Sequence, residues 1–270
     1  MRKLTIVSAT LLACLATPAL AVDTTASSDA TAMGTALSGT GFHLTGATLT
    51  TDTQNGFFTN GSAIGIDHGV VLTTGLLGCV GNSNTTGDCE GGGAGSTLNL
   101  TFTLDSDSLF FNYVFGSEEY NEYVGSNFND AFQLLLNGPG FTDVNLAQIP
   151  GGGGPVSINN VNNGSNSVYF NDNSLGAYPF ELDGFTDVLT ASATGLTAGA
   201  TYTLSFIVGD VGDTRYDSAV LIQGGTVGTT QTPPGAVPEP STWAMMLLGF
   251  GAIGGAVRRG RSKRRTALTA

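Results

Sequence analysis

The feature that most limits the fold of this chain is an alternation of apolar and polar side chains. Between residues 98 and 104, Leu and Phe alternate with Asn and Thr, and in residues 202–208 the apolar residues Tyr202, Leu204, Phe206 and Val208 repeat the spacing. Successive side chains of a β-strand point to opposite faces, so this alternation predicts strands with one buried and one solvated face. No segment between residues 22 and 230 shows sustained 3.6-residue periodicity. The sequence therefore predicts an all-β fold.

Turn-forming segments separate the predicted strands. Two runs, residues 109–115 and 131–136, are nearly continuously apolar, as expected for strands covered on both sides. Further strands are predicted at residues 70–73, 156–161, 167–170, 186–190 and 219–223. Glycine- and asparagine-rich stretches lie between them at residues 91–95, 151–154 and 159–166. Short strands with frequent turns favour a single antiparallel β-sandwich or jelly-roll-like domain over residues 22–230.

The charges of this domain exclude several functions. Residues 22–240 hold all 21 acidic residues but only one base, Arg215, which gives a formal charge of about −20. Such a surface repels phosphate backbones, so we expect no nucleic-acid partner. The domain has no lysine, which excludes Schiff-base chemistry and a P-loop. We expect no organic cofactor, but the unbalanced negative charge favours bound cations.

The N-terminus has the pattern of a secretory signal peptide. Arg2 and Lys3 precede an apolar core, and the small residues Ala19 and Ala21 form a cleavage site for signal peptidase. The signal peptide is predicted to span residues 1–21, and the mature chain is predicted to begin outside the cytoplasm.

The C-terminus carries a second targeting pattern. A Pro/Gly linker at residues 231–236 precedes Val237, Pro238, Glu239 and Pro240, and then an apolar helix is predicted at residues 243–257. Arg258 and Arg259 begin a basic tail, which keeps that end cytoplasmic while the helix is in the inner membrane. Residues 237–265 resemble a PEP-CTERM sorting signal. The resemblance implies recognition by an exosortase and release to the cell surface or the exopolysaccharide matrix.

Two cysteines remain after the predicted signal peptide. Cys79 and Cys89 flank a loop rich in turn-forming residues. In an oxidising compartment this arrangement favours a structural disulfide between them.

The densest polar segment follows the apolar run at residues 109–115. Carboxylate and amide oxygens are the ligands that Ca²⁺ prefers, and a second acidic group follows the strand predicted at residues 202–208. The candidate metal ligands are Glu118, Glu119, Glu122, Asn129, Asp130, Asp210, Asp213 and Asp217. Two alternatives stay open for them: a solvated acidic loop, and a glycosidase-type acid pair.

Several motifs in order resemble the choice-of-anchor L domain. They include FNYVFGSEEY at residues 111–120, and further pieces lie at residues 69–75, 128–130, 155–161, 183–186 and 217–220. The resemblance covers residues 30–225. It implies a secreted bacterial surface protein with an extracellular β domain and one of several C-terminal sorting signals, and it brings no catalytic residues.

These observations predict an exported, non-catalytic protein with a structural or adhesive role at the bacterial surface or in the exopolysaccharide matrix, stabilised by Ca²⁺. A glycan-binding module that uses Tyr120 or Tyr123 is the alternative, and a polysaccharide hydrolase that uses Glu118 or Glu119 is a further one.

Overall fold

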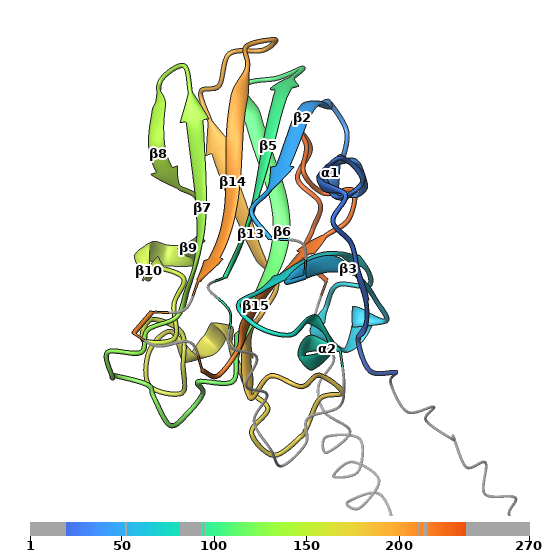
Figure 1. Ribbon diagram of the computed structural model, residues 1–270. Coiled ribbons are helices and arrows are strands. Elements are labelled where there is room, and N and C mark those ends of the chain that lie inside the picture. The colour runs from blue at the N-terminus through green and yellow to red at the C-terminus, as the bar shows by residue number, and fades with distance from the viewer. Residues whose placement is uncertain are drawn as a thin grey trace, which may run out of the picture.

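Two antiparallel sheets packed face to face confirm the predicted β-sandwich (Figure 1). The computed structural model describes residues 20–51, 53–81, 93, 95–209, 211–212 and 215–235. The predicted signal peptide up to Ala19, the residues from 236 onward, Cys89, Asp210 and Asp213 lie outside the described residues.

The smaller sheet has five strands. Their spatial order is β2 (Phe42–Leu49), β5 (Ser96–Leu104), β14 (Tyr202–Gly209), β7 (Ala131–Gly138) and β8 (Phe141–Asn145). Residues of β5 alternate strictly between buried and half-buried, as do those of β14. The alternation predicted for residues 98–104 and 202–208 is therefore confirmed.

The larger sheet has eight strands. Its order is β1 (Asp23–Ala26), β3 (Asn55–Thr59), β4 (Gly69–Thr73), β15 (Ser218–Gln223), β6 (Ser108–Ser117), β12 (Gly184–Thr186) and β11 (Phe170–Asp172). The eighth strand, β13 (Leu189–Thr194), also pairs with β6. The last strand of the chain, β15, thus lies between β4 and β6 in the interior of the sheet. A two-stranded sheet of β9 (Gln148–Ile149) and β10 (Gly154–Pro155) lies apart from both.

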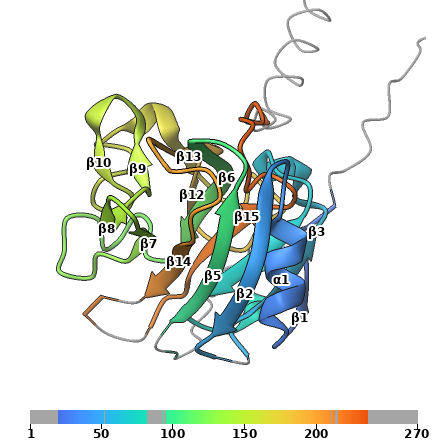
Figure 2. The same cartoon turned by 90° about the horizontal axis from the view of Figure 1, so that it is seen from above.

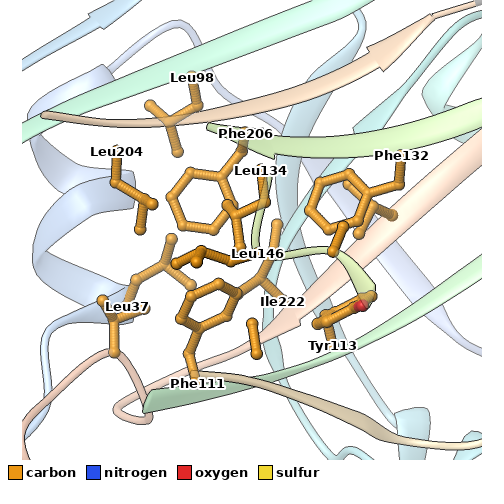
Figure 3. Packing of buried hydrophobic residues seen from close by; sticks show 14 of the residues in the cluster. Leu37, Leu98, Phe111, Tyr113, Phe132, Leu134, Leu146, Leu204, Phe206 and Ile222 are labelled. Carbon is orange, nitrogen blue, oxygen red and sulfur yellow. The ribbon is translucent and has the colours of Figure 1, made fainter. Parts of the chain in front are cut away.

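Aromatic side chains fill the space between the layers (Figure 3). Phe111 of β6 meets Phe206 of β14 with ring centroids 5.5 Å apart, and Tyr113 meets Phe132 of β7 at 5.0 Å. All four rings are almost completely buried. Truncation of a buried aromatic residue to alanine typically costs about 3–5 kcal/mol, so these contacts dominate the cohesion of the sandwich.

A two-turn helix, α1 (Ala30–Leu37), covers one edge of the sandwich beside β2 (Figure 2). Asp29 caps it by accepting a hydrogen bond of 2.9 Å from the Ala32 amide. Gly34 permits close packing, because a Cβ there would lie 2.9 Å from side-chain carbons of Leu44 and Leu100. Sequence periodicity missed this helix because only Met33 and Leu37 mark its buried face. The other short helical segments are α2 (Leu77–Val80) and 3-10 turns at Gly61–Ile64, Pro150–Gly152 and Ser167–Tyr169.

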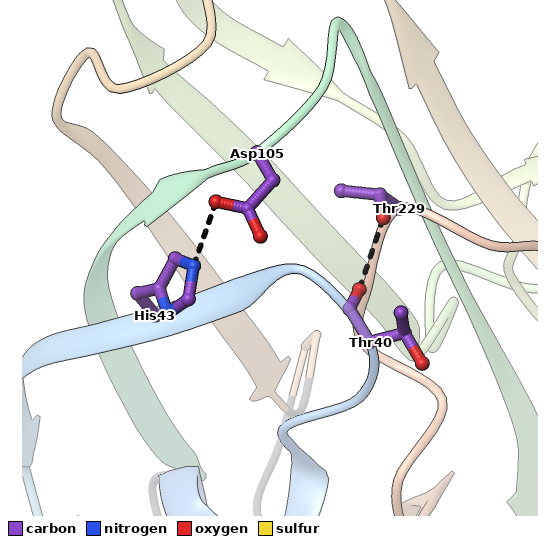
Figure 4. A network of polar contacts seen from close by, with 4 residues as sticks. All are labelled: Thr40, His43, Asp105 and Thr229. Carbon is purple, nitrogen blue, oxygen red and sulfur yellow. Dashed lines mark hydrogen bonds and ion pairs between the residues drawn. The ribbon is translucent and has the colours of Figure 1, made fainter.

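Residues 224–232, here called the C-terminal strap, run along this edge after β15. The Gly225 amide donates to Ala36 O at 2.9 Å, and the Val227 amide donates to Leu37 O at 3.0 Å. The Thr229 hydroxyl donates to Thr40 O at 3.1 Å, close to the surface pair of His43 and Asp105 (Figure 4). The strap therefore belongs to the folded domain.

Three of the shorter strand predictions were wrong in detail. In residues 156–161 only Ser157 pairs, in an isolated bridge with Ala131, and residues 158–160 form a turn that the Asn162 side chain holds by donating to Ile158 O. Residues 167–169 form a 3-10 turn before β11, and the strand predicted at 186–190 is divided between β12 and β13. Among the described residues, no helix is long and apolar enough to cross a membrane.

Candidate functional site

Three of the motif segments singled out in the sequence meet at one end of the larger sheet. β4, β15 and β6 are neighbours, so the segments that contain Gly75, Asp217 and Gly116 lie side by side. Ser218 of β15 is in register with Ser117 of β6. On its other side, Ser218 donates its amide hydrogen to the Thr74 hydroxyl at the end of β4. The sequence could not show this contact, because more than 140 residues separate Thr74 from Ser218.

Four of the predicted metal ligands are buried at this end. The exposed fractions are 3% for Glu118 and 1% each for Glu119, Asp130 and Asp217. We call these four residues the buried carboxylate cluster. A buried carboxylate is strongly destabilising unless hydrogen bonds, a base or a cation compensates for its lost hydration. The alternative of a solvated acidic loop is therefore wrong for these four residues, although it fits the exposed Glu122.

Asp217 joins the turn after β4 to the end of β6. Its Oδ2 accepts a hydrogen bond of 3.1 Å from the Leu76 amide, and its backbone carbonyl accepts one of 3.0 Å from the Glu118 amide. The carboxylate lies against the Cα of Gly75, where a Cβ would be 1.9 Å from the Asp217 carboxyl atoms. Gly75 is needed here for space.

Asp130 joins the loop after β6 to β15 and to the segment before it. Its Oδ2 accepts a hydrogen bond of 2.8 Å from the Ser218 hydroxyl, and its Oδ1 accepts one of 2.8 Å from the Val211 amide. The Ser218 hydroxyl also lies 2.8 Å from the Ser117 hydroxyl, which in turn accepts a hydrogen bond from the Glu119 amide. The carboxylates of Asp130 and Asp217 and the backbone amides of Glu118 and Glu119 thus belong to one polar network that connects three strands and two loops.

Sequence reasoning missed the hydroxyl residues of this network. Besides Ser117 and Ser218, the Thr74 hydroxyl accepts a hydrogen bond of 2.8 Å from the Ser218 amide. The available signal was their position beside acidic residues at the ends of apolar runs. That signal is weak, because serine and threonine are common at strand ends.

Two of the remaining predicted ligands, Glu122 and Asn129, lie within the described part of the chain. Glu122 is exposed, and the Asn129 side chain accepts a hydrogen bond of 2.9 Å from the Asn159 amide, which braces the neighbouring loop. Among the described residues, no group of three or more His, Cys, Asp or Glu side chains is arranged to hold a metal ion. The full predicted ligand set also includes Asp210 and Asp213, which lie outside the described residues, so this set stays a prediction.

The tyrosines of the same region divide into two groups. Tyr113 and Tyr120 are fully buried, and burial raises the pKa of both phenols. Tyr123 is half-buried, and its ring centroid lies 5.0 Å from that of Tyr216 and 5.6 Å from that of Phe128. Tyr120 cannot stack on a sugar from this position, and neighbouring rings restrict access to Tyr123.

A second polar cluster surrounds Asp172 at the end of β11. Asn121 and Asn163 donate to its Oδ2 at 3.2 and 2.9 Å, while the Ser174 amide and hydroxyl donate to its Oδ1 at 3.1 and 2.7 Å. Partial burial acts to raise the pKa of Asp172, but these hydrogen bonds outweigh it and the pKa is lowered. The cluster therefore holds an ionised aspartate between two loops.

Cys79 lies in α2 and is buried, but Cys89 lies outside the described residues, so the disulfide stays a prediction.

At the N-terminal end, Ala21 is half-buried and the following Val22 is buried in the larger sheet's outer apolar cluster. The first residue of the predicted mature chain therefore packs against the domain.

Two protein-family models match the chain. No curated protein and no solved structure matches the chain. The PEP-CTERM protein-sorting motif matches residues 236–262, which marks an exported surface protein that an exosortase processes. The model of the choice-of-anchor L domain matches residues 20–228, the whole of the sandwich and most of its C-terminal strap. The chain belongs to the choice-of-anchor L domain family.

Proposed function

We propose that this protein is a non-catalytic structural and adhesive component of the bacterial surface or exopolysaccharide matrix, and that Ca²⁺ stabilises its acidic end. The observation that carries the proposal is the use of the buried carboxylates. Asp130 and Asp217 accept hydrogen bonds from backbone amides and from Ser218, and so connect segments that are far apart in the sequence. A mechanical role of this kind suits a protein that holds its shape outside the cell.

The charge balance supports a bound cation. The described residues between 20 and 235 contain one Lys or Arg, the exposed Arg215, whereas five carboxylates are almost completely buried: the four of the buried carboxylate cluster and Glu181. Hydrogen bonds compensate part of the cost of burying these charges, and a divalent cation would compensate more. Val211, which donates to Asp130, directly follows Asp210 in the sequence. Hard oxygen ligands of this kind suit Ca²⁺, which takes about six to eight of them.

The burial of the glutamates is unfavourable for a hydrolase. A glycosidase pair must reach the scissile bond of a polymer, but Glu118 and Glu119 are 3% and 1% exposed. We therefore expect no release of reducing sugar when the protein is incubated with isolated exopolysaccharide. Release that Glu118→Gln or Glu119→Gln abolishes would replace the structural proposal with a catalytic one.

Thermal unfolding in EDTA and in millimolar Ca²⁺ tests the cation. A hundredfold excess of Ca²⁺ over its Kd stabilises the folded state by about 2.7 kcal/mol. For a domain of this size, that corresponds to a rise in Tm of about 5–11 °C. The double variant Glu118→Gln, Asp130→Asn should lose the rise, whereas the control Asp67→Asn, at an exposed site before β4, should keep it.

An unchanged Tm in the wild type would remove Ca²⁺ from the proposal. The adhesive role has a separate test in cells that produce the protein. Deletion of the protein should weaken the cohesion of the surface matrix, and a chain with the substitution Gly75→Ala should restore it only poorly. Full cohesion without the protein would overturn the structural role.

A further inference from the structure

The outer face of the five-stranded sheet differs in charge from the rest of the domain. Strands β2, β5, β7 and β14 contain no Asp, Glu, Lys or Arg, and β8 contains only Asp143 at the sheet edge. The domain as a whole carries about −20. Two carboxylates lie at its edges: Asp143 accepts a hydrogen bond of 2.9 Å from the Asn137 side-chain amide, and Asp105 pairs with His43 of β2. The rows between these edges hold no charged side chain, so the centre of this face is neutral on a strongly anionic protein.

Hydroxyl and amide side chains cover this face. They project outward because the residues that alternate with them along each strand point inward and form the core. We call the following set the neutral face: Thr48, Thr97, Asn99, Thr101, Thr103, Gln133, Asn137, Thr203 and Ser205. Thr48 and Gln133 are exposed, and the other seven residues are half-buried. In Figure 1 none of the described elements lies in front of these strands.

Register places these side chains in rows across the strands. Thr203 of β14 pairs with Thr101 of β5 on one side and with Asn137 of β7 on the other. One row along, Ser205 pairs with Asn99, and Asn99 with Thr48 of β2. Cross-strand neighbours in a sheet lie about 4.5–5.5 Å apart at Cβ, so the rows form a regular array of polar groups.

One row is also held by side-chain hydrogen bonds. The Ser205 hydroxyl donates to the Asn99 Oδ1 at 2.6 Å, and the Asn99 Nδ2 donates to the Thr48 hydroxyl at 3.4 Å. These bonds fix the orientation of the Asn99 amide before any ligand arrives. A preorganised polar row loses less conformational entropy on binding than a flexible one.

Two half-buried apolar residues lie among the polar ones. Ile207 of β14 follows Ser205 on the same face, and Leu135 of β7 is the register partner of Ser205. A sugar ring has hydroxyls at its rim and C–H groups on its faces, so a surface that mixes hydroxyls, amides and small apolar areas matches it chemically.

We infer that the neutral face binds an extended neutral polysaccharide chain. The inference rests on the proposed matrix role and names the ligand class for it. Charge selects the ligand: an anionic polymer would be repelled by the domain, and a neutral one would not. Single exposed hydrogen bonds contribute little, so affinity requires many rows to bind one polymer at once. We therefore expect binding to long chains and not to monosaccharides.

The test is retention of the full chain, in mild detergent, on insoluble neutral glycans. The probes are cellulose, curdlan, starch granules and the immobilised neutral fraction of the producing cell's exopolysaccharide, with alginate gel as the anionic comparison. The wild type should be retained on at least one neutral probe and not on alginate.

The double variant Thr101→Glu, Thr203→Glu should bind that probe at least tenfold more weakly. The matched control, Ser192→Glu with Thr194→Glu, adds the same charge to exposed positions of β13 in the other sheet and should bind like the wild type. The charge-free double variant Thr101→Val, Thr203→Val should also bind more weakly, because it removes two central hydroxyls. Equal Tm values for all variants would show that folding is not the cause.

Three outcomes would overturn the inference. They are no retention of the wild type on any neutral probe, undiminished retention of both Thr101/Thr203 variants, and loss of retention on Tyr123→Ala alone, which would place the site on the aromatic loops. A failure here leaves the Ca²⁺-dependent Tm and the matrix-cohesion assay unaffected, so it is distinguishable from failure of the proposed function.

Discussion

The contact between Gly75 and the Asp217 carboxylate gives the sharpest test of the network. In Gly75→Ala, the new Cβ would lie 1.9 Å from Cγ and both carboxyl oxygens of Asp217, far inside van der Waals contact. Asp217 is buried and cannot swing into solvent without leaving its place beside β4. The substitution must therefore displace the carboxylate and its hydrogen bond from the Leu76 amide.

The expected change in the free energy of unfolding on Gly75→Ala combines two destabilising effects and one stabilising effect. Loss of a hydrogen bond to a charged group costs about 1.5–3 kcal/mol, and overpacking costs about 1–3 kcal/mol. Replacement of glycine by alanine stabilises the folded state by about 0.4–1 kcal/mol, because it reduces the conformational entropy of the unfolded chain. The net loss in free energy of unfolding is about 2–5 kcal/mol, which lowers Tm by roughly 4–20 °C for a domain of this size.

A double-mutant cycle distinguishes the clash with the Asp217 carboxylate from any other destabilising effect of alanine at position 75. Asp217→Ala alone leaves the Leu76 amide unsatisfied, at a cost of about 1–3 kcal/mol. It also removes the three atoms nearest to the new Cβ, so Gly75→Ala should cost little in that background. The coupling energy from denaturant unfolding, followed by circular dichroism, should be about 2 kcal/mol or more.

Gly78→Ala is the matched control, because a Cβ there meets no atom within 4 Å. It should leave the free energy of unfolding unchanged or slightly raised. The reasoning would be refuted if Gly75→Ala cost the same in the Asp217→Ala background as in the wild type, or if it cost no more than Gly78→Ala.

Two further predictions concern single polar groups. The Tyr113 hydroxyl is buried and has no hydrogen-bond partner among the described residues, so Tyr113→Phe should keep or raise Tm; a fall of several degrees would contradict this. The lowered pKa of Asp172 means that its ionised form stabilises the fold above about pH 4 and that this contribution is lost as the pH falls through the folded-state pKa. Asp172→Asn should therefore reduce the denaturant midpoint at pH 7, and the difference from the wild type should shrink below pH 4; a difference that grows in acid would show the opposite sign.

The strands were predictable where their signal is local. Alternation along residues 98–104 and 202–208 follows from the burial of one face, and each segment carries that signal by itself. The helix α1 is too short to show a period, and the turn at 158–160 is held by one side chain, Asn162. Such features depend on contacts that no window of the sequence contains.

The candidate site was predictable in composition but not in burial. Glu118, Glu119 and Glu122 are close in the sequence, yet the first two are buried and the third is exposed. The difference arises because Ser117 pairs with Ser218, about a hundred residues later in the sequence. This pairing keeps Glu118 and Glu119 at the buried end of the larger sheet, whereas Glu122 lies beyond it. Pairing between such distant segments cannot be inferred from one sequence.

The place of β15 has a consequence for export. This strand lies between β4 and β6, yet it is the last strand of the chain, and the strap follows it to residue 232. A chain that crosses a membrane from its N-terminus exposes the unpaired edges of β4 and β6 until residues 218–223 have emerged. The larger sheet can close only when translocation has almost reached the sorting motif at residue 236. Folding and sorting are thereby ordered in time: the completed domain and the motif become available together, and a chain stalled before that point presents open strand edges to chaperones and proteases.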